Sequence, residues 1–166
     1  EYFYETRARL GVKRAQVAAA KPTGSKPSQG AALAKLLAAF DEAMNDDLNT
    51  AGAMDPMGRI FQLANKLCDE KRPTLEDLDA AEAAVARACG VLGVATGDPE
   101  AFFARVTARR VAERGITAAQ VEGLIAARED ARLARDFARA DELRQALSAL
   151  RIEVRDGASG TTWRAV

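Results

Sequence analysis

Apolar residues recur at helical spacing along most of the chain. The first complete stripe is formed by Leu33, Leu36, Leu37, Phe40 and Met44. Steps of three and four positions place these side chains on one face of an α-helix. We expect this helix to end at Asn45-Asp46-Asp47, because short polar side chains favour caps and turns over helix interiors.

The second stripe predicts another amphipathic helix, but its start has two alternatives. The stripe consists of Met57, Ile60, Phe61, Ala64, Leu67 and Cys68. Asn49-Thr50 offers an early cap. Asp55 offers a late cap, with Pro56 in the first turn. We favour the late start and expect a short irregular turn near residues 50–55.

The third stripe opens at Thr74-Leu-Glu-Asp77, which is similar to a capping box. It continues through Leu78, Ala81, Val85, Cys89 and Leu92. We expect Gly93 and the turn at Gly97-Asp98-Pro99 to end the helix, because glycine and proline interrupt helical structure.

The remaining residues predict shorter helices and then a hairpin. The period is weaker over residues 100–116, and Thr117 with Gln120 opens a capped helix that breaks near Asp136. A further helix runs to Leu150, after which Ile152-Glu-Val154 and Thr161-Thr-Trp163 alternate as strands around a glycine-containing turn. The fold class is therefore mainly α: a helical bundle followed by a small α+β domain with a short β-hairpin.

The chain divides into three expected parts. Residues 1–30 are interpreted as a truncated helix end, frayed over residues 1–20, and a mobile linker rich in Pro, Gly, Ser and Lys. Residues 31–97 form the helical bundle, and residues 98–166 form the C-terminal domain. Because the first residue is Glu1 within a helical pattern, the chain is interpreted as a piece of a longer protein.

Composition narrows the function classes. Apolar residues make up 48% of the chain but aromatic residues only 5%, so we expect helices that pack closely on alanine. No apolar run reaches membrane-spanning length and no signal-peptide pattern opens the chain; we expect a cytoplasmic protein. Histidine is absent, which disfavours an independent hydrolase or zinc enzyme. Cys68 and Cys89 are interpreted as core residues.

We assign no metal or cofactor site within the chain. Asp46, Asp47 and Asn49 are interpreted as caps rather than ligands. The net charge is zero, but residues 1–100 carry 12 basic and 15 acidic groups, whereas residues 101–166 carry 12 and 9. This difference favours contact with nucleic acid at the C-terminal end.

Arginines dominate the candidate binding surface. Arg128, Arg132, Arg135 and Arg139 share a face if their helix is continuous. Guanidinium groups bind phosphates and purine acceptors, and the alternative is a solvated face paired with neighbouring acids. Two other candidates are aromatic: Phe137 either stacks on a base or covers the junction of two helices, and Trp163 packs the hairpin or forms a stacking platform.

Two segments resemble the C-terminal third of cysteinyl-tRNA synthetase. The first is Phe40-Asp-Glu-Ala-Met-Asn-Asp-Asp-Leu-Asn-Thr50, which is similar to the start of that family's DALR-type helical domain. The second runs from Ala126-Ala-Arg-Glu-Asp-Ala-Arg132 through Asp136-Phe-Ala-Arg-Ala-Asp141 to Gly160-Thr-Thr-Trp-Arg164 and resembles the anticodon-binding tail. The chain departs from the pattern at Arg151, where the family commonly has glycine.

The resemblance implies a partner and a set of RNA-binding residues. The partner is tRNA-Cys, bound by a monomer, with neither DNA nor a membrane involved. Arg132 matches a base-contacting position, and Asp141 and Asp156 accept hydrogen bonds from base edges. Without the resemblance, these two acids read as a first-turn helix acid and a turn former.

The resemblance also implies that the part of the parent ligase containing the ATP and zinc sites lies outside this chain. The rival hypothesis from the same residues is a helical protein–protein interaction module, motivated by the zero net charge and the Ala/Leu-rich helices.

Overall fold

The computed structural model describes residues 1–20, 29–157 and 160–166. Over these residues the chain is mainly helical and ends in a two-stranded antiparallel sheet, so the predicted fold class is confirmed. The chain forms two compact units, Glu1–Pro99 and Glu100–Val166. The predicted mobility of the linker falls mostly on residues 21–28, which lie outside the described residues.

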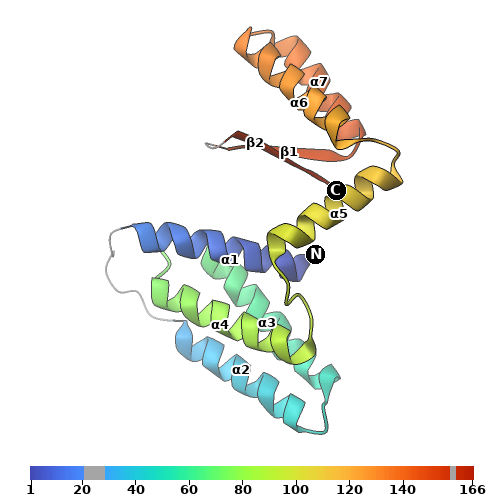
Figure 1. Cartoon of the computed structure of the whole chain (residues 1–166). Helices are drawn as coiled ribbons and strands as arrows, with labels where there is room; N and C mark the ends of the chain where they lie inside the picture. The colour runs from blue at the N-terminus through green and yellow to red at the C-terminus, as the bar shows by residue number, and fades with distance from the viewer. Residues whose placement is uncertain (21–28, 158–159) are drawn as a thin grey trace. The chain divides into compact units, whose positions relative to one another are not determined.

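The first unit is built from α1 (Tyr2–Ala19), α2 (Gly30–Asn45), α3 (Thr50–Asp69) and α4 (Leu75–Leu92). Helices α3 and α4 pack against each other, and each also contacts α1 and α2 (Figure 1). The apolar stripes of the sequence meet in the core, whose largest fully buried residues include Phe40, Phe61, Met57, Ile60, Leu67 and Leu78. The predictions for α2 and α4 are confirmed, and Gly93 ends α4 in a left-handed conformation (φ 66°).

Helix α3 corrects one expectation: it begins at Thr50, not near Asp55. The Asn49 side chain accepts a hydrogen bond from the backbone N–H of Gly52 (2.8 Å) and so caps the first turn. Asp47 and Leu48 both adopt positive φ angles (51° and 57°), which reverse the chain just before the cap. Pro56 lies inside the helix and is buried.

Helix α1 corrects a second expectation, because residues 2–19 form a continuous helix rather than a frayed end. Leu10 is buried in the core of the first unit, and the Phe3 ring centroid lies 4.6 Å from that of Phe61. Thr6 is also buried, and its hydroxyl accepts a hydrogen bond from Asn65 Nδ2 (2.8 Å). Packing against α3 therefore stabilises α1.

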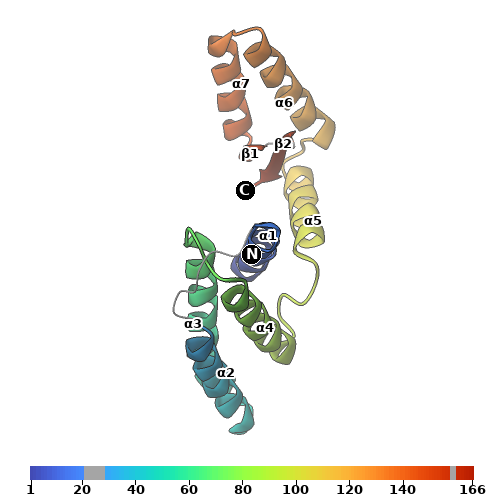
Figure 2. The same ribbon diagram turned by 90° about the vertical axis from the view of Figure 1, so that its left-hand side faces the viewer.

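The second unit consists of α5 (Pro99–Glu113), α6 (Ala118–Leu133), α7 (Phe137–Ala149), β1 (Ile152–Gly157) and β2 (Gly160–Ala165). Figures 1 and 2 both show α6 and α7 side by side, and α7 also contacts β1. Buried residues from helices and strands form its core: Val111, Val121, Ile125, Leu147, Ile152 and Ala165. The predicted capping box at Thr117 and Gln120, the break near Asp136 and the hairpin are confirmed.

The end of α5 is tied to the hairpin and the chain terminus by arginines. Arg110 donates a hydrogen bond to the Ala165 carbonyl (2.9 Å). Arg114 donates to the carbonyls of Leu150 (3.1 Å), Arg151 (3.2 Å) and Val166 (2.5 Å). These contacts fix both strand ends against α5, so the hairpin has a defined position beside α6 and α7.

Candidate nucleic-acid interface

The hairpin and α6 meet at a cluster of charged side chains around Asp156. We call Arg128, Arg132, Asp156 and Thr161 the Asp156 cluster. Arg128 donates from both terminal nitrogens to the two carboxylate oxygens (3.0 and 2.8 Å). Arg132, one helical turn later, donates to Oδ2 (2.9 Å). Thr161, the cross-strand partner of Asp156, donates its hydroxyl to Oδ1 (3.1 Å).

The members of this cluster differ strongly in exposure. The Arg128 side chain is only 12% exposed, whereas those of Arg132 and Asp156 are 49% and 42% exposed. Hydrogen bonding to Arg128, and secondarily to Thr161, holds the pKa of Asp156 well below its usual range, helped by the charges of both arginines and opposed by burial. The same hydrogen bond raises the pKa of Arg128. The carboxylate is therefore ionised throughout the neutral range.

The predicted arginine face is interrupted at the end of α6. Arg128 and Arg132 lie on α6, but Arg135 adopts a left-handed conformation (φ 58°) in the bend that follows. Asp136 then caps α7 by accepting a hydrogen bond from the Arg139 backbone N–H (3.0 Å). The condition for one shared face, a continuous helix, is therefore not met.

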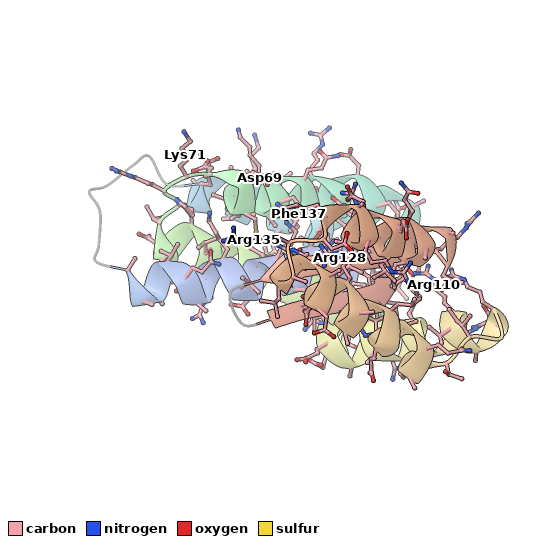
Figure 3. All side chains as sticks on the ribbon, turned by 90° about the horizontal axis from the view of Figure 1, so that it is seen from above. Asp69, Lys71, Arg110, Arg128, Arg135 and Phe137 are labelled. Carbon is pink, nitrogen blue, oxygen red and sulfur yellow. The ribbon has the colours of Figure 1, made fainter. Side chains whose placement is uncertain are left out.

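An exposed apolar pair lies at the same bend. Phe137 is 66% exposed and Leu133 is 84% exposed. Together with Glu129 and Arg132 they line an open hollow of about 470 Å³. Figure 3 labels Phe137 together with two of the arginines predicted to contact RNA, Arg128 and Arg135. A flat ring next to a guanidinium group is suited to an unstacked base and its phosphate.

The remaining predicted site residues lie outside the Asp156 cluster. Asp141 is exposed and pairs with Arg144 at 3.6 Å, although its charge also contributes to the raised pKa of Arg128. Trp163 is half-buried, packs against the core of the second unit and faces Val154 across the hairpin. This position fits the packing interpretation of Trp163, and its predicted contact with RNA stays a prediction.

Two residues of the site escaped the sequence reasoning. The register of the hairpin identifies Thr161, because it lies directly opposite Asp156. Leu133 carried a weaker signal: an apolar residue among charged ones at the end of a helix. Its high exposure next to Phe137 becomes visible only once the bend is formed.

The described part of the chain contains neither a group of metal ligands nor a membrane-spanning helix. No group of three or more Cys, Asp or Glu side chains there is arranged to hold a metal ion. The helices that the structure describes include none with the length and apolar character needed to cross a membrane. Cys68 and Cys89 are free thiols, and burial raises the pKa of both.

Family models and curated relatives match most of the chain. A family model described as "Cysteinyl-tRNA ligase anticodon binding domain" matches residues 114–164, and one described as "DALR domain" matches residues 39–96. The cysteine–tRNA ligase of Nitratidesulfovibrio vulgaris strain DP4 is 42% identical over 130 residues, covering 75% of this chain and 27% of the relative. That of Syntrophotalea carbinolica is 36% identical over 171 residues, covering 95% of this chain and 35% of the relative. The chain thus spans about a third or less of the length of these curated relatives.

Proposed function

We propose that the chain binds the anticodon loop of tRNA-Cys. The proposal follows from its family: the chain belongs to the cysteinyl-tRNA ligase family, as its C-terminal anticodon-binding region. In this proposal residues 98–166 contact the loop, and the helical bundle of residues 31–97 sets the distance from the catalytic part of the ligase. Binding by this chain thereby selects the tRNA to which the full ligase attaches cysteine in the cytoplasm.

The observation that carries the proposal is the side-by-side arrangement of charge and an exposed ring at one end of α6. Arg132 belongs to the Asp156 cluster and also lines the hollow with Phe137. Single-stranded RNA needs cations for its phosphates, flat surfaces for its bases and directional acceptors for its base edges. An ionised Asp156 can serve as such an acceptor for the amino groups of guanine or cytosine when one of its present donors is displaced.

The separate side chains take separate roles. Phe137 stacks on a base, Arg132 and Arg135 attract phosphates, and Asp156 with Asp141 reads base edges. Trp163 supports the hairpin from within. ATP and zinc are assigned to the catalytic part of the ligase, which lies outside the matched region.

The test is binding of fluorescein-labelled anticodon stem-loops, followed by fluorescence anisotropy at low salt. The parent chain should bind a stem-loop with a GCA anticodon more tightly than a stem-loop of equal length with an altered anticodon. Phe137→Ala should weaken binding by a factor of about 5 to 150, which corresponds to about 1–3 kcal/mol for a stacked base. Phe137→Trp should retain binding because tryptophan offers a larger ring.

Leu48→Ala is the matched control, since Leu48 is an exposed apolar residue (71%) of the first unit. It should bind as the parent does. If the parent binds neither stem-loop even at low salt, the proposed function is wrong. In that case the exposed Leu133–Phe137 pair would fit the rival role, a module that docks on another protein through apolar contact.

A further inference from the structure

The carboxylate of Asp156 has no acceptor position left for a ligand. An ionised carboxylate offers about four lone-pair positions. Arg128 and Thr161 fill those of Oδ1 (3.0 and 3.1 Å), and Arg128 and Arg132 fill those of Oδ2 (2.8 and 2.9 Å). A base N–H that is to bond to Asp156 must therefore replace one of these donors.

The three donor residues are not equally replaceable. Arg128 makes two parallel bonds and is only 12% exposed, so its release would break a bidentate pair in a shielded place. Thr161 is held beside Asp156 by the register of the hairpin. Arg132 makes a single bond, is 49% exposed and borders the open hollow with Phe137. Arg132 is thus the donor that can leave without disturbing the fold.

We propose that Arg132 exchanges partners when RNA binds. In the free chain it occupies the outer acceptor position on Oδ2 of Asp156. In the complex its guanidinium moves to a phosphate, rather than to the base edge that the family resemblance implies for Arg132, and a base amino or imino N–H takes its place on the carboxylate. This inference rests on the proposed function. No proton is transferred: Arg132 stays cationic and Asp156 stays ionised.

Arg128 has a different role in this exchange, that of a positioning residue. Its bidentate bond fixes the orientation of the carboxylate and its charge keeps Asp156 ionised after Arg132 has left. Arg128 was predicted from the sequence to contact RNA; we instead assign it to the support of Asp156, because its guanidinium is already bound to Asp156 and mostly shielded from solvent.

Release of Arg132 from Asp156 has a small cost. Breaking this half-exposed ion pair lowers the affinity for RNA by only about two- to fivefold.

Salt dependence of RNA binding distinguishes this exchange from a static cluster. Each phosphate neutralised by a cationic side chain contributes about 0.7 to 0.9 to the slope of log affinity against log salt. With the exchange, Arg132→Gln removes one phosphate contact and lowers the slope by about that amount. Asp156→Asn leaves the slope unchanged, because Arg132 reaches the phosphate in either case, but it abolishes discrimination between anticodons.

A static cluster gives the opposite pair of results. If Arg132 remains on Asp156 in the complex, Arg132→Gln leaves the slope as it was. Asp156→Asn then steepens the slope, because it frees an arginine for a new phosphate contact. Either result overturns the exchange.

Matched variants account for the loss of a charge alone. Arg109→Gln removes an exposed cation of the same unit that pairs with Glu113, and Asp130→Asn removes an exposed anion of α6. Slopes of the test variants are compared with those of these controls on the GCA stem-loop. If the parent chain binds the stem-loop and the slopes match the static pattern, only the exchange fails; if the parent does not bind, the proposed function fails and the exchange fails with it.

Discussion

Replacing Asp156 with asparagine should destabilise the second unit in a manner that depends on pH. Asparagine keeps one acceptor oxygen and the approximate shape of the side chain but removes the negative charge. Of the four hydrogen bonds that Asp156 accepts, three come from arginines and depend on that charge. Hydrogen bonds to charged groups contribute about 1.5–3 kcal/mol when shielded. Because Asp156 is 42% exposed, solvent screening reduces this contribution to about 1 kcal/mol at pH 7.

The sign of the pH effect follows from the lowered pKa of Asp156. A carboxyl group whose pKa is lower in the folded than in the unfolded chain stabilises the fold at pH values above the unfolded pKa. That stabilisation is lost as pH falls below about 4, the ordinary value for aspartate, towards the lower folded pKa. The parent and Asp156→Asn should therefore differ in stability at pH 7 and pH 5 and converge at lower pH.

The chain contains a single tryptophan, Trp163, which is half-buried and packs against the core of the second unit. Thermal unfolding followed by its fluorescence therefore reports on the second unit. A loss of about 1 kcal/mol lowers Tm by about 4–8 °C for a domain of this size. We expect that difference in full at pH 7 and a progressively smaller one as pH falls from about 4 to 2, towards the lowered folded pKa of Asp156.

Asp141→Asn is the matched control. Asp141 is exposed and its ion pair with Arg144 is long (3.6 Å). The Tm of this variant should therefore differ little from that of the parent at any pH. If Asp156→Asn and the parent differ by the same amount at pH 7 and at pH 2, the stabilisation does not come from the charge of Asp156, and the electrostatic account of the cluster is wrong.

Two further predictions concern backbone geometry at the ends of helices. Arg151→Gly should stabilise the second unit by about 0.5–1 kcal/mol, because Arg151 has a left-handed φ of 55°; Arg151→Ala, which retains a Cβ atom, should give no such gain in the same fluorescence assay. Asn49→Ala should destabilise the first unit by about 1 kcal/mol through loss of the cap on α3. Urea unfolding followed by circular dichroism would measure this loss, with Asn45→Ala, at the other side of the turn, as the control. An unchanged urea midpoint for Asn49→Ala would refute the role of the cap.

Caps and apolar stripes predicted the helices whose ends they mark. They failed where contacts with residues distant in sequence determine the start of a helix. The stripe from Leu33 to Met44 and the Thr74 cap are contained in a few neighbouring residues, so α2 and α4 were predictable. At the start of α3, Pro56 weighed against an early helix, because proline favours the first turn. The Asn49 cap and the burial of Pro56 in the core outweigh this local disadvantage, as tertiary packing commonly does.

The site shows the same division between local and distant information. Spacing along α6 places Arg128 and Arg132 one turn apart, and turn residues predict the hairpin that carries Asp156. The distance between α6 and β1, however, is set by the packing of one core cluster, to which Ile125 on α6 and Ile152 on β1 both belong. No local pattern reports that distance, so the sequence predicted three separate RNA contacts where the structure has one connected cluster.

This connection changes how the charges of the site must be interpreted. If Arg128, Arg132 and Asp156 acted separately, each would offer its full capacity to RNA. In the structure the two cations and the anion satisfy one another, and the shielded member, Arg128, is committed to the protein. Only the exposed edge around Arg132 and Phe137 is then available to a ligand. If RNA binds as proposed above, a site arranged in this way attracts phosphates weakly when free, and a base edge that replaces Arg132 at Asp156 determines whether binding becomes stronger. In that proposal, specificity for the base depends on the partner that Asp156 loses as well as on the one that it gains.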